Sequence, residues 1–314
     1  MDFDALCQQL HLGALIEEPM RLTGGLMHKM YRIVTESGVY AVKCLNPHVM
    51  AHPTAAANFS AAEELERKLE ETALPLLPAL TIDGRKMQEV DGNYCYLFPY
   101  FEGKALTEGD IMPRHCEIVG DLLARLHAVE RKQEPIQRET LSFDWDACNL
   151  SDEDKTMLWE MQTAANAAIL PPLSTICHND MDPKNVLWNG TDCRIIDLEC
   201  LGYGSPYLEL LETALCWAGY ECGEVDFDRF AAFVTAYARA GGDLNADWEA
   251  VYAANAGRLA WLHYNLLRAD GSEGEEATAL GEAEVAKTLV CIKGYTKIQD
   301  EIVRVMDNIT KASP

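Results

Sequence analysis

Several features that would place this sequence of 314 residues in a specialised class of protein are missing. No apolar run approaches the roughly 20 residues that a membrane-spanning helix needs, and there is no internal repeat or low-complexity tract. The first ten residues, MDFDALCQQL, are acidic, unlike the basic start of a secretory signal. We therefore expect a globular protein of the cytoplasm that does not associate with membranes.

Positive charge is scarce in this sequence. The 26 lysines and arginines face 50 aspartates and glutamates, which gives a formal net charge of -24. This excess of negative charge argues against unaided binding to nucleic acid or to anionic lipid. It is compatible with a cationic small molecule, although many cytosolic proteins are acidic without binding one. We expect no nucleic-acid partner, and the composition leaves the oligomeric state open.

Paired cysteines are also missing, although cysteine itself is not. The sequence has 11 cysteines, an odd number, and no C-x-x-C spacing. Free, mostly buried thiols in a reducing compartment explain this pattern, so we predict no native disulfide. His48 and His52 could share one helical turn, but Pro53 follows them and no thiolate lies beside them. We therefore predict no metal site there.

The first third of the chain has the residue pattern of β-strands. The stretches MYRIVTE and VYAVKCL are rich in β-branched and aromatic residues, and Ser37-Gly38 between them predicts a hairpin. Two more short strands are expected within LTIDGRKMQEV and NYCYLFPYF. A helix is expected over roughly 60–72, where Ser60 and Glu63 form an S-x-x-E capping box.

From Pro113 onward the pattern changes to that of helices. Apolar residues recur at helical spacing in RHCEIVGDLLARLHAV. Further helices are expected over 151–168, 206–219, 226–240, 246–268 and 276–307. Strands in front and helices behind predict an α+β fold with two lobes rather than an alternating βαβ fold. We place these lobes at residues 1–100 and 101–314.

The densest polar chemistry lies in HNDMDPKN, residues 178–185. It has the spacing H-x-D-x-x-x-x-N, and Asp197 follows twelve residues after Asn185, inside RIIDLE. Phosphoryl transfer needs a carboxylate beside the attacking hydroxyl and oxygen ligands for Mg²⁺. The stretches VLW and CRII, separated by Asn189-Gly190, predict a hairpin that presents Asp197 to the same cleft. The alternative is a polar turn in which these side chains only cap backbone groups.

A lysine far upstream strengthens the phosphoryl-transfer interpretation. Strand alternation in VYAVKCL puts Val39, Ala41 and Lys43 on one face. Ala41 could then cover an adenine while Lys43 reaches the phosphates. Taken alone, Lys43 would be an ordinary solvated strand lysine.

With these motifs in order, the sequence resembles the aminoglycoside phosphotransferase and choline kinase family, relatives of protein kinases. LTGGLMHKMYRIVT resembles the nucleotide loop and first strands, YAVK the phosphate-lysine strand, and YLFPYFEGKAL the hinge. LARLHAV resembles the helix before the catalytic loop, HNDMDPKN that loop, and IIDLECLGYGSPYLEL the metal-binding segment. The resemblance spans nearly the whole chain. It implies a bilobal protein-kinase-like fold with a small antiparallel-sheet lobe carrying one helix and a larger, mostly helical lobe.

The resemblance also implies an activity, namely transfer of the γ-phosphate of ATP or GTP to a hydroxyl group with the help of Mg²⁺. It makes Asp180 the catalytic base or hydroxyl-orienting group, Asn185 and Asp197 the Mg²⁺ ligands, and Lys43 the ligand of the α- and β-phosphates. Gly24 and Gly25 fall in the loop over the phosphates, where glycine lets backbone approach an anion closely.

Further positions of the nucleotide site are implied in the same way. Backbone groups at Pro99, Tyr100 and Phe101 would meet the adenine. The carboxylate partner of Lys43 falls on Glu63, although Glu66 lies closer to the apolar face of the same helix. We assign Glu63 and leave Glu66 as the alternative.

Departures from the protein-kinase pattern indicate a small-molecule acceptor. DLE replaces D-F-G, and Asp182 stands where protein kinases carry a lysine. We assign Asp182 and Glu199 to the acceptor side, where their charge favours an amine-bearing, aminoglycoside- or choline-like acceptor. A neutral sugar or a homoserine-type acceptor is the alternative. So is a catalytically silent nucleotide-binding protein that acts through partners.

Four other residues invite a functional interpretation. His127 is expected to pack behind the catalytic loop, and His178 to orient that loop through backbone contacts. Trp217 and Trp261 lie on helices that wall the acceptor pocket in the resembling family, but aromatic residues of helices more often belong to the core.

Overall fold

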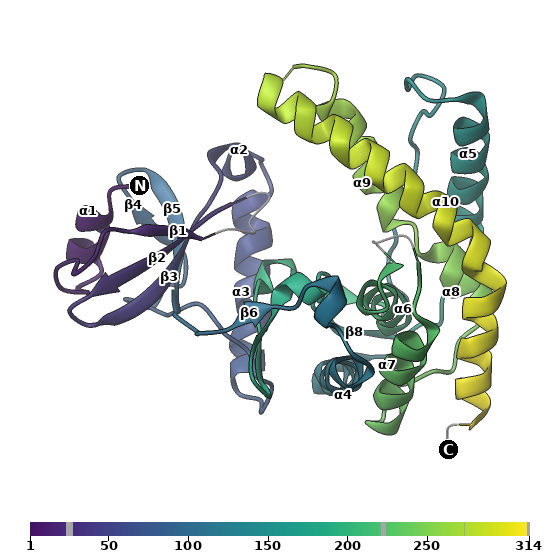
Figure 1. The fold of residues 1–314 in the computed structure, drawn as a ribbon, viewed down its shortest axis with the longest axis horizontal. Coiled ribbons are helices and arrows are strands. Elements are labelled where there is room, and N and C mark those ends of the chain that lie inside the picture. Colours follow the sequence, from purple (N-terminus) through teal and green to yellow (C-terminus); the bar gives the residue numbers. More distant parts are fainter. Residues whose placement is uncertain (23–27, 221–223, 273, 313–314) are drawn as a thin grey trace. The chain divides into compact units, whose positions relative to one another are not determined.

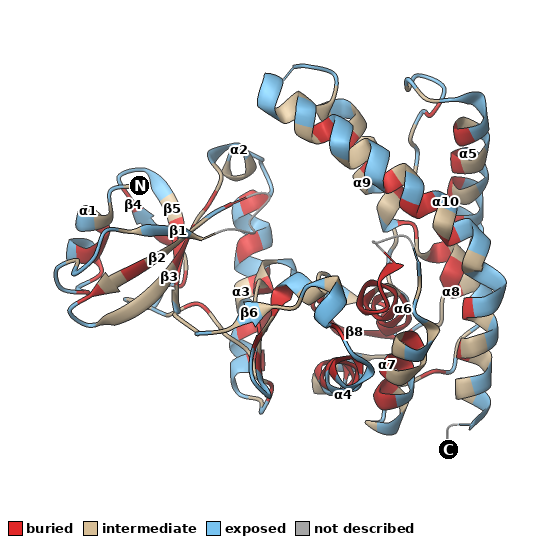
Figure 2. Ribbon diagram, in the orientation of Figure 1, coloured by how far each residue is buried: buried red, intermediate tan, exposed pale blue. Residues whose placement is uncertain are grey.

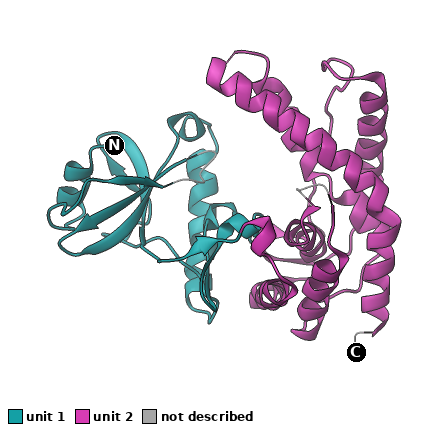
Figure 3. Ribbon diagram, viewed as in Figure 1, with its two compact units in different colours: residues 1–106, 178–202 teal, residues 107–177, 203–314 magenta. Residues whose placement is uncertain are grey.

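The computed structural model describes residues 1–22, 28–220, 224–272 and 274–312 (Figure 1). The chain forms two compact units (Figure 3). The first contains residues 1–106 and 178–202, and the second contains residues 107–177 and 203–314. The sequence analysis divided the chain into lobes at residues 1–100 and 101–314, and it therefore placed 178–202 in the second lobe. This division into functional lobes stays a prediction. Every residue assigned to the nucleotide, the metal or the acceptor belongs to unit 1.

Unit 1 is built on a five-stranded antiparallel sheet with the order β1-β2-β3-β5-β4. The strands are β1 Met20–Leu22, β2 Lys29–Thr35, β3 Gly38–Cys44, β4 Gln88–Val90 and β5 Asn93–Pro99. The predicted hairpin is confirmed, with Thr35 opposite Gly38. Of LTIDGRKMQEV only the last three residues form a strand, because Asp83 and Gly84, both at positive φ, turn the chain before them.

Three helices accompany this sheet, α1 Phe3–Gln9, α2 Pro47–Met50 and α3 Ala55–Glu70. The prediction of a helix over 60–72 was wrong at its start, because α3 already begins at Ala55, after Thr54. The run AAANFSAA contains no helix breaker, so nothing stops the helix from extending to that point. Ser60 therefore lies inside the helix, and its capping box with Glu63 does not exist.

The two faces of the sheet pack against different helices. Leu6 of α1 joins Ile33, Val42 and Leu97 in one buried cluster, and Phe59 of α3 joins another on the opposite face. Successive residues are buried in the central strands, Val42 and Lys43 in β3 and Cys95 to Leu97 in β5, so both faces of these strands are covered (Figure 2 colours the chain by burial). Because Val42 points to the α1 side, its neighbour Lys43 points to the α3 side.

The segment 178–202 adds a small sheet to unit 1. It contains the short helical turns η2 Pro183–Asn185 and η3 Leu198–Cys200, with β9 Val186–Asn189 and β10 Asp192–Ile195 between them. With β6 Lys104–Ala105 the strand order is β10-β9-β6, and the predicted hairpin at Asn189-Gly190 is confirmed. The backbone of Ile195 forms two hydrogen bonds with the chain that follows α3. Its C=O accepts from Leu77 N at 2.9 Å, and its N–H donates to Pro75 O at 2.8 Å. These bonds explain why the segment belongs to unit 1.

Unit 2 is mostly helical. Its helices are α4 Pro113–Val129, α5 Asp152–Ala167, α6 Pro206–Trp217, α7 Phe227–Arg239, α8 Trp248–Ala254, α9 Gly257–Arg268 and α10 Glu275–Ala312, with the short elements η1 Glu108–Asp110, β7 Arg131–Lys132, β8 Ser174–Cys177 and β11 Gly202–Gly204. The single helix predicted over 246–268 was wrong, because the chain leaves the helical conformation at Asn255. The other helices are confirmed, with ends shifted by a few residues.

A membrane-crossing segment was sought among the helices of the described residues. None of them combines the length and the apolar character that such a segment requires.

Candidate active site

The loop from His178 to Asn185, the candidate catalytic loop, is held by the ring of His178, which is 1% exposed. Its Nδ1 accepts a hydrogen bond from the backbone N–H of Asp180 at 3.3 Å, and its Nε2 lies 3.0 Å from the carbonyl of Ile196. Because Nδ1 accepts, the proton of the neutral ring sits on Nε2 and is donated to Ile196. His178 thus fixes the loop to the end of β10 through backbone contacts, as expected from the sequence.

The carboxylate of Asp180 is held on both oxygens by its own loop. Asn185 Nδ2 donates to Oδ2 and to the main-chain oxygen of Asp180, both at 2.8 Å, and Lys184 Nζ lies 3.0 Å from Oδ1. Asn185 has therefore turned its amide nitrogen toward Asp180, which leaves its Oδ1 as the atom that can ligate a cation. Burial, and then the charge of Asp182, raise the pKa of Asp180 to about 6, against the opposing effect of Lys184.

Lys184 is a site residue that the sequence analysis missed. Its ammonium lies 3.0 Å from Asp180 Oδ1 and 3.0 Å from Asp182 Oδ2, while its side chain stays 55% exposed. Burial acts to lower the pKa of Lys184, but Asp182 and Asp180 outweigh it and raise the pKa. The spacing of four residues from Asp180 was a signal that could have identified the pair. The loop thus supplies its own cation, which offsets much of its acidic charge.

Lys43 meets the D-x-E segment directly. Its Nζ lies 2.6 Å from Asp197 Oδ1 and 2.5 Å from Glu199 Oε2. Asp197 has a φ of 64°, a left-handed conformation that aspartate tolerates better than most residues. Burial acts to lower the pKa of Lys43, but the two carboxylates outweigh it and raise the pKa. Burial also acts to raise the pKa of Glu199, but the hydrogen bond of His28 and the charge and hydrogen bond of Lys43 lower it to about 2.

The expected partnership of Lys43 with a glutamate of α3 is not formed in the described part of the chain. Glu63 Oε1 accepts from the hydroxyl of Tyr96 at 2.9 Å, and the alternative, Glu66, accepts from the ammonium of Lys86 at 2.9 Å. Both helix carboxylates are therefore bound elsewhere, and Glu199 holds the position that the sequence analysis gave to Glu63. Glu199, which we had assigned to the acceptor, contacts the phosphate lysine instead.

The residues expected around the nucleotide base come from β3 and from the chain at the end of β5. Gly24 and Gly25 lie outside the described residues. Ala41 is half-buried on β3 opposite Phe98 of β5, on the same face as Lys43. Pro99 closes β5 opposite Tyr40, the Tyr100 N–H donates to Val39 O at 3.1 Å, and Phe101 O accepts from Gly103 N at 2.9 Å. Their contact with adenine stays a prediction.

Unit 2 contains a second polar cluster, around His127. Its Nε2 lies 2.6 Å from Glu209 Oε2, its Nδ1 lies 2.8 Å from the hydroxyl of Tyr237, and Cys177 Sγ is 4.0 Å from Nε2. These groups resemble a metal-ligand set by type. At 2.6 Å, however, the nitrogen and oxygen form a direct hydrogen bond, and an ion bound by both would separate them further. The cluster is a packed hydrogen-bond network, as expected for His127.

The helix aromatics named in the sequence analysis pack into unit 2. Trp217 is fully buried, so its face is not available to a ligand in this packing. Trp261 stacks on Tyr264, with ring centroids 5.6 Å apart, and its Nε1 donates to Glu284 at 3.2 Å.

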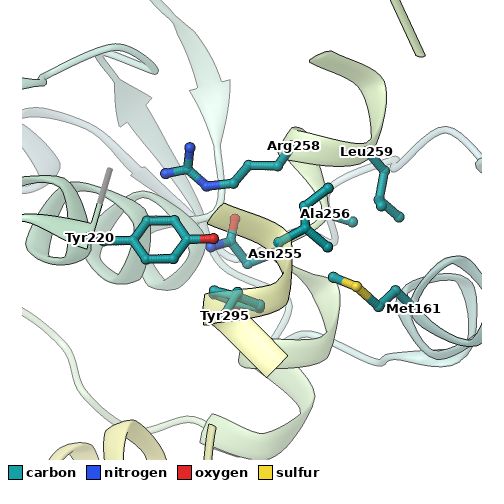
Figure 4. A pocket seen from close by; sticks show the side chains of 8 residues that line it. Met161, Tyr220, Asn255, Ala256, Arg258, Leu259 and Tyr295 are labelled. Atoms are coloured by element: carbon teal, nitrogen blue, oxygen red, sulfur yellow. The ribbon is translucent and has the colours of Figure 1, made fainter. Parts of the chain in front are cut away.

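A cavity in unit 2 lies beside Arg258 and the rings of Tyr220 and Tyr295 (Figure 4). Arg258 pairs with Glu212 at 2.6 Å and its guanidinium lies 4.3 Å from the centre of the Tyr220 ring. The cavity measures only about 10 Å³, the space of about one water molecule. It is therefore too small for an acceptor in this packing.

No disulfide joins the ten cysteines that the structure describes, and Cys222 lies outside the described residues. The absence of a native disulfide from the whole chain stays a prediction.

Comparison with known sequences places this site in a family. The profile of the phosphotransferase enzyme family matches residues 20–254. Homoserine kinase from Pseudomonas aeruginosa is 27% identical over 191 residues, which cover 56% of this chain and 58% of that protein. Homoserine kinase from Methylobacillus flagellatus is 23% identical over 234 residues, which cover 69% of this chain and 68% of that protein. The chain thus spans little more than half the length of the Pseudomonas relative that it matches.

Proteins described as kinases are among the solved structures that share this fold. An amicoumacin kinase in complex with AMP-PNP, Ca²⁺ and Ami has a TM-score of 0.64 at 12% identity, covering 96% of this chain and 94% of that one. A choline/ethanolamine kinase family protein from Mesorhizobium loti has a TM-score of 0.62 at 17% identity, covering 99% and 100%. These similarities confirm the predicted kinase-like α+β fold. Because the family profile covers well over half of the chain, this protein belongs to the phosphotransferase enzyme family.

Proposed function

We propose that this protein is a small-molecule kinase that transfers the γ-phosphate of ATP to an alcohol, with Mg²⁺ as the metal. The observation that carries the proposal is two bonded pairs of side chains within unit 1, on two stretches of chain that the hydrogen bond from Ile196 N to Asn185 O at 2.9 Å joins. Lys43 bonds Asp197 at 2.6 Å, and Asp180 bonds Asn185 at 2.8 Å. A buried lysine beside one carboxylate, and an amide beside another, match what a nucleotide phosphate and its metal need.

The donor set fits Mg²⁺ rather than a softer metal. Asp197 offers a carboxylate and Asn185 an amide oxygen, the hard oxygen ligands that Mg²⁺ prefers. We propose ATP as the nucleotide, because Lys43 presents a positive charge to its phosphates. Lys43 lies on the α3 face of the sheet, the face that also carries Ala41. Asp197 and Asn185 would hold the ion, which would supply positive charge against the negative charge that develops on the transferring phosphoryl group. A comparison of Mg·GTP with Mg·ATP in a binding measurement distinguishes the alternative nucleotide, GTP.

The residues of the loop then perform the remaining tasks. Asp180 orients the acceptor hydroxyl and takes up its proton as the oxygen–phosphorus bond forms and the bond to the ADP oxygen breaks. Lys43 holds the phosphates in place. Lys184, already beside Asp180, offsets the carboxylate charge next to the incoming phosphoryl group. Most of the catalytic effect is thus positioning and electrostatics.

The first acceptor to test is homoserine, because the curated relatives are homoserine kinases. It carries an amine, as we expected of the acceptor, together with a carboxylate. The charge argument for a purely cationic acceptor is weaker than the sequence suggested, because Lys184 already offsets Asp180 and Asp182. We propose that the protein acts in the cytoplasm, without nucleic-acid or membrane partners.

A screen for ADP release tests the proposal. Homoserine, choline, ethanolamine, an aminoglycoside and matched neutral polyols are each offered with Mg·ATP, and the Asp180→Asn variant serves as the control. We expect turnover with one chemical class and its loss in the variant. Binding of Mg·ATP without turnover of any acceptor would instead favour the catalytically silent alternative. No binding at all would overturn both.

A further inference from the structure

The partner of the phosphate lysine in this protein does not come from the helix that flanks the sheet. Lys43 bonds Glu199, two residues after Asp197, while both candidate glutamates of α3 have other partners. The following contacts explain why the helix glutamates are unavailable and why Glu199 is well suited to replace them.

Glu66 forms a buried ion pair with Lys86. Its Oε1 accepts from Ala79 N at 2.7 Å and from Lys86 Nζ at 2.9 Å, and Lys86 also donates to Ala79 O at 3.0 Å. Lys86 is completely buried and also pairs with Glu70, so releasing Glu66 toward Lys43 would remove one of its two carboxylates and would leave the N–H of Ala79 without its acceptor.

Glu63 is held by three donors. Its Oε1 accepts from the hydroxyl of Tyr96 at 2.9 Å and from Met87 N at 3.2 Å, and its Oε2 pairs with Arg67 at 3.1 Å. Tyr96 lies opposite Lys43 in the sheet, so the Glu63 carboxylate is tied to the neighbour of Lys43 rather than to Lys43 itself.

Glu199 is held on both oxygens in a different way. Its Oε2 lies 2.5 Å from Lys43 Nζ, and its Oε1 lies 3.3 Å from His28 Nε2. The backbone N–H of Asn46 donates to His28 Nδ1 at 3.0 Å, which requires a lone pair on that nitrogen. The ring proton of neutral His28 is therefore on Nε2 and points at Glu199. His28 can hold Glu199 without being charged.

We propose that Glu199, anchored by His28, is the positioning carboxylate of Lys43 in the nucleotide-bound enzyme, in place of a glutamate from α3. This inference rests on the proposed function. It makes His28 a further positioning residue and gives the two acids of D-x-E separate tasks. Asp197 is available to the metal, and Glu199 keeps Lys43 directed at the phosphates. Glu199 then serves Lys43 rather than the acceptor, because Lys43 and His28 each lie against one of its two oxygens.

Nucleotide binding separates these roles. The variants are Glu199→Gln, His28→Leu and His28→Gln, with Glu66→Gln as the helix comparison and the exposed Glu64→Gln as the matched surface control. We expect Glu199→Gln to weaken Mg·ATP binding about 10- to 100-fold, the range for loss of a charge-assisted bond. The Mg²⁺ concentration for half-saturation should stay unchanged. His28→Leu should weaken binding in the same direction, and His28→Gln, which retains a side-chain N–H donor, should restore most of it.

Two results would overturn the assignment. A shift in Mg²⁺ dependence for Glu199→Gln, with nucleotide affinity unchanged at saturating metal, would make Glu199 a metal ligand. Weaker nucleotide binding in Glu66→Gln, at an unchanged unfolding midpoint, would return the role to the helix.

A nucleotide-free measurement keeps the assignment testable if the proposed kinase activity fails. Acylation of Lys43 in the protein alone is followed by mass spectrometry, because a lysine paired with a carboxylate reacts slowly. Because Asp197 also pairs with Lys43, the comparison is made in an Asp197→Asn background. There Glu199→Gln should raise the Lys43 rate several-fold, whereas Glu64→Gln should leave it unchanged. An equal Lys43 rate with and without Glu199→Gln in that background would refute the pairing itself, whatever the fate of the proposed function.

Discussion

The buried pair between Lys86 and Glu66 allows a stability prediction whose size follows from the structure. The Lys86 side chain is 0% exposed and that of Glu66 is 7% exposed. In Lys86→Met the apolar volume is nearly kept, but Glu66 loses its cation and remains buried. Removing one partner of such a pair costs about 3–5 kcal/mol. With a midpoint shift of roughly 2–4 °C per kcal/mol, the unfolding midpoint should fall on the order of 10 °C.

The loss should also depend on pH in a defined direction. Burial raises the pKa of Glu66, and the hydrogen bond and charge of Lys86 oppose this rise. Without Lys86 the folded-state pKa rises further above the unfolded one. Stability from such a carboxyl group is present while it is protonated and is lost as the pH rises through the folded pKa. The deficit of Lys86→Met should therefore widen as the pH rises above the ordinary pKa of a glutamate.

Thermal unfolding followed by circular dichroism measures both effects. The exposed Lys29→Met is the control and should stay within about 0.5 kcal/mol of the parent. The double variant Lys86→Met/Glu66→Leu removes both charges and should recover much of the loss. A midpoint within about 2 °C of the parent for Lys86→Met, or a double variant as unstable as the single one, would refute the reasoning.

The remaining predictions concern catalysis, metal, acceptor and thiols. Asp180→Asn should cut kcat by roughly 10²–10⁴ while Mg·ATP affinity measured by calorimetry stays nearly constant, and a parallel loss of affinity would contradict its role. Asp197→Ala, or EDTA added to the parent, should remove the thermal shift given by Mg·ATP, and an undiminished shift would argue against the metal. Asp182→Asn should raise the acceptor KM in the ADP-release assay, whereas an unchanged KM would assign Asp182 to holding Lys184. Alkylation without reductant, after unfolding, should modify all 11 cysteines, and a reproducibly unmodified pair would reveal a disulfide.

Local chemistry was readable from the sequence wherever neighbouring residues determine it. The hairpin at Ser37-Gly38 follows from turn residues between alternating strands, and the loop from His178 to Asn185 follows from its spacing. The helix start was mispredicted because Ser60 and Glu63 satisfy a capping pattern inside a segment that is helical anyway. Pattern alone does not say which of two adequate starting points a helix uses.

The partner of Lys43 was not readable for a different reason. Glu63, Glu66 and Glu199 are all glutamates within chain reach of the lysine, and only tertiary contacts decide among them. Glu66 is committed by Lys86, a residue with no motif around it. His28 gives no sequence signal either, because its role depends on the backbone N–H of Asn46 fixing its tautomer.

The division of work between Asp197 and Glu199 also bears on how the site tolerates its charges. In the structure Lys43 is shared by both carboxylates, with 2.6 Å to one and 2.5 Å to the other. If Asp197 turns to a metal, it exchanges one cation for another, so its charge stays compensated. Lys43 in turn keeps Glu199 and gains the phosphates. Neither step leaves a buried charge without a partner, which is the costly condition. A single carboxylate serving both cations could not provide this, and that is a physical reason for the second acid in D-x-E.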